Sequence, residues 1–238
     1  MLDIVIPLGH GSKWHDNELR YGLRSIEKHL TGYRNVFIVG RCPDFLNANA
    51  IFLPQPFLTG NPAHNIAMNI LEACRDERLS ETFAYLNDDY FFTKAVDIST
   101  YPTYHKEALE KTYLQNNTDY RKHVRATMLR LEELALPSLN YDTHYPSIFE
   151  KEKMRTLIEG NDFVRPFGFI LKSLYLNTYP PAKAEFRADC KQHHIKKLAQ
   201  WQELAEQTEV FSIADTCLNP TFKQFISEAY PTPSKWEK

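Results

Sequence analysis

Two adjacent aspartates, Asp88 and Asp89, have the placement in this sequence that most strongly indicates chemistry. They follow the apolar residues 83–86 and precede the aromatic residues 90–92, so both carboxylates are expected at the end of a strand that favours burial. Two like charges held there destabilise a fold unless a metal ion or substrate hydroxyls compensate them. The structural alternative is a polar turn, where Asp is common for its own hydrogen-bonding reasons. Because aromatic residues flank the pair on both sides, we favour a functional site.

A segment near the N-terminus places further charged side chains on one expected helix. Glu18 lies in the first turn of this helix. Arg20 and Arg24 are one turn apart, so their two guanidiniums can bind one phosphate together. A solvated, purely structural charged face is the alternative, which the spacing alone favours. The helix is expected to begin at the same end of the sheet as the aspartate pair, and a helix N-terminus attracts anions. This position supports a substrate-binding role.

A histidine and an arginine in the second half complete the set of candidates. His144 lies in a proline-terminated loop with Asp142 close enough in sequence to orient its imidazole, so general acid–base catalysis and a structural role are equally supported. Arg165 is flanked by apolar residues, which fits either a phosphate clamp or a structural ion pair. The neighbouring His193 and His194 would point apart on a helix and are interpreted as structural.

The composition limits the classes of protein to consider. The 238 residues are 43% hydrophobic and 24% charged, enough for one substantial core. The formal net charge of −2, with no basic tract interleaved with aromatics, argues against nucleic acid as a partner. No apolar run approaches the roughly 20 residues of a membrane span, and the start of the chain lacks a signal-peptide pattern. We therefore expect a cytoplasmic protein without an integral membrane segment, its four dispersed cysteines reduced.

Apolar segments in the first ninety residues alternate between strand and helix patterns, as in α/β proteins. Strands are expected at residues 2–8, 36–39, 51–53 and 83–86, and helices at 16–30 and 63–74. This alternation predicts a mostly parallel central sheet flanked by helices, which binds ligands where the carboxyl ends of its strands open. The second half is expected to be mainly helical, with helices at 120–134, 149–158, 169–176 and 221–229, a polar helix that ends at 207, and a strand at 210–213.

Four segments resemble, in the same order, the sequence blocks of the Stealth family of sugar-phosphate transferases, which includes bacterial capsule polymerases and the catalytic region of GlcNAc-1-phosphotransferase. The first, residues 2–7, is similar to the strand of the form IDVVYTWVDG, whose last part is replaced here by Leu-Gly-His-Gly-Ser. The most specific is the second, residues 16–29 with 36–39 and 85–92. Residues 143–146 with Arg165 resemble the third block. Residues 211–215 and 230–237 resemble the fourth, whose pattern ends in FPxPSxFE.

The resemblance implies a glycosyltransferase-A-like fold in a single catalytic domain, residues 1–238. Residues 1–95 would form the nucleotide-sugar-binding α/β half, and the mainly helical residues 96–238 would complete the site. It implies transfer of hexose-1-phosphate from a UDP-sugar to an acceptor hydroxyl of a carbohydrate, in surface or capsular polysaccharide synthesis. It assigns Asp88 and Asp89 to a divalent cation, Mg²⁺ or Mn²⁺, or to the sugar phosphate. Three of the remaining candidates are expected to be catalytic: Glu18, His144 and Arg165. The others are expected to bind substrate or phosphate: Arg20, Arg24, Asn87 and Asp215.

Two other functions remain open at the level of the sequence. A glycosyltransferase on the same scaffold would use the aspartates as a metal site but direct attack to the anomeric carbon, so UDP rather than UMP would be released. A protein that keeps the fold and binds carbohydrate or nucleotide sugars without turnover would release neither. The sequence leaves the sugar, the acceptor and the oligomeric state open.

Overall fold

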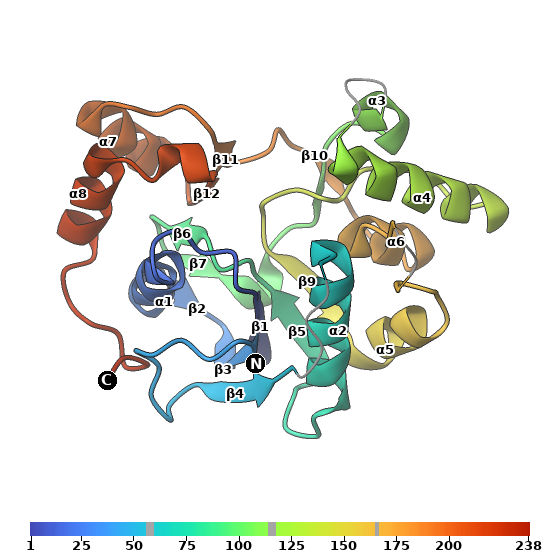
Figure 1. Ribbon diagram of the computed structural model, residues 1–238, viewed down its shortest axis with the longest axis horizontal. Helices are drawn as coiled ribbons and strands as arrows, with labels where there is room; N and C mark the ends of the chain where they lie inside the picture. The colour runs from blue at the N-terminus through green and yellow to red at the C-terminus, as the bar shows by residue number, and fades with distance from the viewer. Residues whose placement is uncertain (56–59, 114–117, 165–166) are drawn as a thin grey trace.

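The centre of the computed structural model, which describes residues 1–55, 60–113, 118–164 and 167–238, is a five-stranded sheet (Figure 1). Its strand order is β4-β3-β1-β5-β9, in which the first four strands are parallel and β9 is antiparallel to β5. The strands are β1 Leu2–Leu8, β3 Tyr33–Gly40, β4 Ile51–Pro54, β5 Thr82–Tyr85 and β9 Ser147–Glu150. The predicted α/β class with a mostly parallel central sheet is confirmed.

Helices cover both faces of this sheet because its strands carry apolar residues on both sides. On β1, Ile4 and Ile6 pack with α1, whereas Val5 belongs to the core cluster on the α2 side. Figure 1 shows α1 on one side of the sheet and α2, α5 and α6 on the other. The helices beside the sheet are α1 Asn17–His29, α2 Pro62–Arg75, α5 Lys151–Glu159 and α6 Leu171–Thr178. Helices α3 Leu109–Tyr113 and α4 Asp119–Glu133 pack against each other, and α4 also packs against α6.

A third apolar cluster holds the C-terminal segment beside the first half of the chain. Trp201, Phe211 and Phe222 are fully buried and pack with Phe91 from the segment that follows the aspartates. The backbone pairs there as well, in a small sheet of order β11-β12-β6. The elements are β6 Tyr90–Phe92, β11 Lys191–Gln192, β12 Val210–Ile213, α7 Leu198–Gln207 and α8 Pro220–Ala229. This packing returns residues 189–215 to the carboxyl edge of the central sheet.

The prediction of a helix at 149–158 is wrong in its first residues. Phe149 lies in β9, opposite Phe83 in the antiparallel ladder, and the helix α5 starts only at Lys151. Burial of Phe149 against β5 outweighs the helical spacing of the segment. The other short elements, which the sequence analysis did not predict, are β2 Leu30–Thr31 paired with β7 Val96–Asp97, β8 Tyr104–His105 paired with β10 Glu185–Phe186, and the 3₁₀ turns Ile98–Thr100 and Asp215–Cys217.

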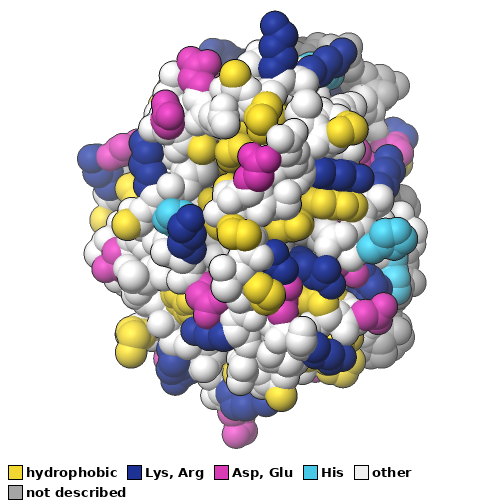
Figure 2. All heavy atoms as spheres, turned by 90° about the vertical axis from the view of Figure 1, so that its left-hand side faces the viewer, with side chains coloured by type: hydrophobic (Ala, Val, Ile, Leu, Met, Phe, Trp, Pro, Cys, Tyr) yellow, Lys and Arg dark blue, Asp and Glu magenta, His cyan; other side chains and the backbone are white. Residues whose placement is uncertain are grey.

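The C-terminal tail is fastened to α1 by an ion pair. Arg24 donates two hydrogen bonds of 2.7 Å to the carboxylate of Glu237 and a third to the carbonyl of Tyr230. Trp236 is buried beside them in the α1-side core. On the face that carries α7, α8 and this tail, basic and acidic side chains are interspersed (Figure 2). Among the described residues, no helix combines the length and apolar character that crossing a membrane requires.

Candidate active site

A cleft of about 900 Å³ opens at the carboxyl ends of β1 and β5. Its walls come from the loop after β1, the starts of α1 and α2, the β5–β6 loop, β11 with the residues after it, and the turn after β12. The ionisable side chains that line it include Glu18, Asp88, Asp89, Lys191 and Asp215. Parallel sheets bind ligands at this edge, so the cleft is the candidate active site.

The aspartate pair forms the electronegative part of the cleft. Asp89 accepts a hydrogen bond of 2.7 Å from Ser212 Oγ and lies 3.6 Å from Lys191 Nζ through the same oxygen, Oδ2. Its other oxygen, Oδ1, is buried and has no hydrogen-bond partner among the residues that the structure describes. Burial, followed by the charges of Asp89 and Glu18, raises the pKa of Asp88 well above its ordinary value. The fold therefore concentrates negative charge here that its own residues leave partly uncompensated.

Helix α1 brings Glu18 close to the aspartates because Gly22 allows close packing. A Cβ atom at Gly22 would lie 3.1 Å from the carbonyl oxygen of Tyr90, a tight contact that a larger residue could make only with a small local shift. Ser25, one turn later, accepts a hydrogen bond of 3.0 Å from the backbone N–H of Phe92. Glu18 is itself buried and accepts a hydrogen bond of 2.8 Å from Ser12 Oγ. Its carboxylate is thus held at the cleft wall.

The antiparallel strand β9 brings His144 to the same edge. Ser147, at the start of β9, is opposite Tyr85, at the end of β5, so the loop before β9 reaches the segment that carries the aspartates. The partner of the imidazole is Asp189, which lies 2.9 Å from Nδ1 and also accepts a hydrogen bond of 2.8 Å from the backbone N–H of His144. The expectation that Asp142 orients the ring is wrong, because its carboxylate accepts a hydrogen bond from Tyr120.

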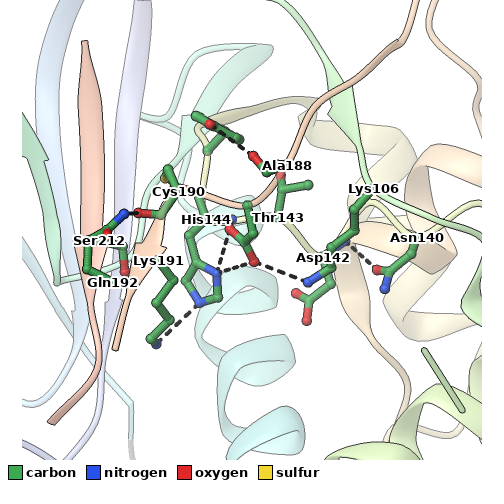
Figure 3. Close-up of polar contacts among 12 residues, drawn as sticks. Lys106, Asn140, Asp142, Thr143, His144, Ala188, Cys190, Lys191, Gln192 and Ser212 are labelled. Atoms are coloured by element: carbon green, nitrogen blue, oxygen red, sulfur yellow. Dashed lines mark hydrogen bonds and ion pairs between the residues drawn. The ribbon is translucent and has the colours of Figure 1, made fainter. Parts of the chain in front are cut away.

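Lys191 links the histidine to the aspartate pair. Its Nζ lies 3.3 Å from His144 Nε2 and 3.6 Å from Asp89 Oδ2, and Figure 3 shows it beside the His144 ring. Because an ammonium group only donates, this contact assigns the lone pair to Nε2, and Nδ1 then donates its proton to Asp189. Burial opposes ionisation of Asp189, but hydrogen bonds from His144 and the charge of Lys106 outweigh it and hold the pKa of Asp189 below its ordinary value.

A buried lysine fixes the loop that carries His144. Lys172, on α6, is 4% exposed and donates to the carbonyl oxygens of Thr143 at 2.5 Å and Tyr145 at 3.1 Å. These two residues flank His144 on either side. Burial lowers the pKa of Lys172 to about 8. Lys172 is therefore a positioning residue for the imidazole loop, and it is not among the residues that line the cleft.

Of the other candidate residues from the sequence, some line the cleft and others lie outside it. Asp215 lines the cleft but is exposed and paired with Lys13 at 2.8 Å, and Asn87 is half-buried in the loop of the aspartates. Arg20 lies outside the cleft lining, 3.6 Å from Glu237, and Arg24 binds the C-terminal tail. The structure thus does not bring the two arginines of α1 to the aspartates. Arg165 lies outside the described residues, so its predicted role is unchanged.

Sequence reasoning missed Asp189, Lys191 and Ser212. Each lies in or next to the short strands β11 and β12, and the register that places Lys191 opposite Ser212 and Ser212 opposite Tyr90 brings them to the site. The only signal available was a mixture of charged residues around Cys190. The pair His193 and His194, interpreted as structural, also lines the cleft. Among the described residues, no group of three or more His, Cys, Asp or Glu is arranged to hold a metal ion.

The chain is similar to part of a known phosphotransferase. It is 41% identical, over an alignment of 100 residues, to the N-acetylglucosamine-1-phosphotransferase subunits alpha/beta of Mus musculus and 40% identical to those of Homo sapiens. The alignments cover 36% of this chain and only 8% of each relative. A solved glycosyltransferase involved in glycosylation of the major capsid of PBCV-1 is 10% identical, with a TM-score of 0.45 over 98% of this chain and 100% of that chain. No protein-family model matches the chain.

Proposed function

We propose that this protein is a transferase that moves hexose-1-phosphate from a UDP-sugar to a carbohydrate hydroxyl, in surface or capsular polysaccharide synthesis, with residues 1–238 as one glycosyltransferase-A-like catalytic domain. The observation that carries the proposal is the convergence on one cleft of two aspartates, a buried glutamate and a lysine that contacts an Asp-oriented imidazole. Phosphoryl transfer depends mainly on positioning and on neutralising charge, and this set of groups is sufficient for both. The partial similarity to a phosphotransferase supports the same chemistry.

The aspartate pair fits a divalent cation, Mg²⁺ or Mn²⁺. The unpartnered, buried Oδ1 of Asp89 is an available oxygen ligand, and the raised pKa of Asp88 marks charge that a cation would offset. Two protein carboxylates suffice, because Mg²⁺ in phosphate-transfer sites completes its coordination with substrate phosphates and water. When bound, the cation neutralises charge on the donor phosphates.

Lys191 and His144 have separate roles in the proposed reaction, phosphate binding and general-base catalysis. Lys191 binds a donor phosphate, which draws its ammonium away from His144 and leaves the Nε2 lone pair available. His144 then takes the proton of the acceptor hydroxyl while Asp189 holds the ring and stabilises its positive charge. The acceptor oxygen bonds to the β-phosphorus, the bond from that phosphorus to the bridging oxygen breaks, and UMP leaves with the electron pair.

The nucleotide that is released tests this proposal. The protein is incubated with a panel of UDP-sugars and carbohydrate acceptors, with Mg²⁺, Mn²⁺ or EDTA, and the nucleotide is identified by chromatography. We expect UMP in the presence of cation and little in EDTA. Release of UDP without UMP would instead establish transfer of the sugar itself. A sugar nucleotide that binds without release of either nucleotide would establish a non-catalytic binding protein.

Lys191→Gln separates phosphate binding from general-base catalysis. We expect KM for the donor to rise by about tenfold, the loss expected for one charge-assisted contact. Glu77→Gln is the matched control, because Glu77 is exposed and precedes β5 at the opposite end of the sheet. An unchanged donor KM in Lys191→Gln would remove the phosphate-binding role from this residue.

A further inference from the structure

A second pocket, of about 450 Å³, lies next to the cleft and has no role in the proposed chemistry so far. His10 and Ser12 line both cavities, so the two are neighbours across the segment that follows β1. The remaining lining includes Asp16, Asn17, Arg20, Arg41, Asp44 and Phe45. Its volume is within the range of small-molecule sites.

The wall between the two cavities is held in an unusual backbone conformation. His15 and Asp16, neither of them glycine, have φ values of 54° and 57°, in the left-handed region. Ser12 Oγ fixes this conformation by accepting hydrogen bonds from the backbone N–H groups of Trp14 and Asp16, while it donates to Glu18 in the cleft. Such conformations persist where contacts enforce them and concentrate at ligand sites. One hydroxyl thus connects the second pocket to the proposed active site.

The charges of the second pocket indicate what kind of ligand it can hold. Asp16 forms an ion pair with Arg41, whereas Arg20 lies 3.6 Å from the buried carboxylate of Glu237, which also pairs with Arg24. With the exposed Asp44, the two carboxylates of the lining balance its two guanidiniums. No net positive charge therefore remains to attract a phosphate. This argues for a neutral ligand.

Two polar atoms of this lining make no hydrogen bond among the described residues. Asp16 Oδ1, an acceptor, is buried and unpartnered, and the buried donor Arg20 Nε lies 3.6 Å from Glu237 Oε2, too far for a hydrogen bond. A hydroxyl group both donates and accepts, so a ligand with several hydroxyls can satisfy the two atoms at once. Paired acidic and basic side chains beside an available acceptor and donor are suited to a saccharide.

We propose that the second pocket is the acceptor subsite and binds a neutral saccharide through its hydroxyls. The binding claim stands on the pocket alone, and the role as acceptor rests on the proposed transferase function. The shared wall lets a saccharide in the second pocket direct a hydroxyl toward the cleft, whose lining residue Lys191 contacts His144. This assigns Arg20 to the acceptor rather than to the donor phosphate.

Binding can be measured without any turnover. The methyl glycosides of glucose, mannose and galactose, and separately inorganic phosphate, are titrated into the ¹⁵N-labelled protein, and amide shifts are followed by NMR. We expect at least one glycoside to shift amides at residues 10–17 and 41–45. Asp44→Ala and Arg41→Gln should weaken that binding by about fivefold or more, the loss expected for one hydrogen-bonding side chain, and Glu77→Ala should not. Asp44 is exposed, so its variant tests the site even if Arg41→Gln fails to fold.

Two results would overturn the saccharide subsite. One is the absence of localised shifts up to about 100 mM glycoside, beyond which a specific site has no useful affinity. The other is that phosphate, rather than any glycoside, shifts these amides. The acceptor role is tested by kinetics: Asp44→Ala should raise acceptor KM by a larger factor than donor KM, and an unchanged acceptor KM would refute that role. Glycoside binding to a protein that releases no nucleotide would refute the transferase function and leave the saccharide site in place.

Discussion

Buried carboxylates at the two ends of the central sheet have pKa shifts in opposite directions. At the amino end, Asp3 is completely buried, and Arg34 donates two hydrogen bonds to it at 2.6 and 3.1 Å. The backbone N–H groups of Asn35 and Ser80 complete its partners. Burial opposes ionisation of Asp3, but these bonds outweigh it and lower its pKa. At the carboxyl end the pKa of Asp88 is raised, because burial and neighbouring negative charges act together.

This difference separates residues that hold the fold from residues that are available for chemistry. The carboxylate of Asp3 has its hydrogen-bonding capacity used by the protein, as has that of Glu237 in the tail. Asp89 accepts a hydrogen bond from Ser212 and has a longer contact to Lys191, and its other oxygen is buried and unpartnered among the described residues. Sites that must bind charged ligands retain such unfavourable electrostatics, at a cost in stability.

The largest expected effect is on turnover at the carboxyl end. Asp89→Asn keeps an oxygen for Ser212 but removes the charge, so we expect nucleotide release to fall by about a thousandfold, as for the loss of a preorganised charge-stabilising group. The fold should remain intact, which circular dichroism and urea unfolding will check. Activity within tenfold of the unaltered protein would mean that the pair is not part of the site.

His144→Ala should have the next largest effect. We expect kcat to fall by about a hundredfold, the contribution of a positioned general base. Asp189→Asn should act in the same direction but less strongly, since the ring would keep a hydrogen-bonding partner. A pH–rate profile distinguishes catalysis from positioning: the loss of rate in acid that a general base produces should disappear in His144→Ala and persist in Lys172→Met. A loss below tenfold for His144→Ala would restrict the imidazole to a structural role.

The sequence could predict the four parallel strands of the sheet and the edge at which some candidate site residues lie. Apolar runs and helical spacing defined β1, α1, β3, β4, α2 and β5, because each has enough residues to show a period. Their order then placed Glu18 and Asp88 at one edge, since parallel strands end on the same side. The same reasoning could not show that Arg24 forms an ion pair with Glu237, because that contact joins residues 213 positions apart in the sequence.

The rest of the site depends on strand register that the sequence does not display. The two-residue strand β11 carries no periodicity, yet its pairing with β12 places Lys191 beside Ser212. Asp142 was the plausible partner of His144 by proximity in sequence, whereas Asp189 reaches it through the fold. Long-range pairing of polar residues follows from the packing of the third core cluster around Trp201, and a single sequence gives no measure of that packing.

At the amino end, Asp3→Asn should destabilise the fold. The variant loses charge-assisted hydrogen bonds from Arg34 and two backbone donors, so we expect a decrease in unfolding free energy of about 2 kcal/mol. Tryptophan fluorescence in urea measures it. Because the pKa of Asp3 is lowered in the folded state, its contribution is present above its ordinary pKa and is lost as pH falls through the folded value. The decrease in unfolding free energy caused by the substitution should therefore be smaller in acid. A decrease that does not depend on pH would contradict the ion-pair explanation.

Asp88→Asn should change stability in the opposite direction, and by less. A carboxyl whose pKa is raised on folding contributes stability below its ordinary pKa of about 4, and this contribution is lost as pH rises through the raised value. Removing the charge should therefore stabilise the fold at pH 7, by about 1 kcal/mol given partial exposure to the cleft, and should change little near pH 4. Urea unfolding is measured in EDTA, because a bound cation would offset the same charge. A variant destabilised at pH 7 would show that the two ends of the sheet use their carboxylates alike, and that the aspartate pair is a structural element of the fold.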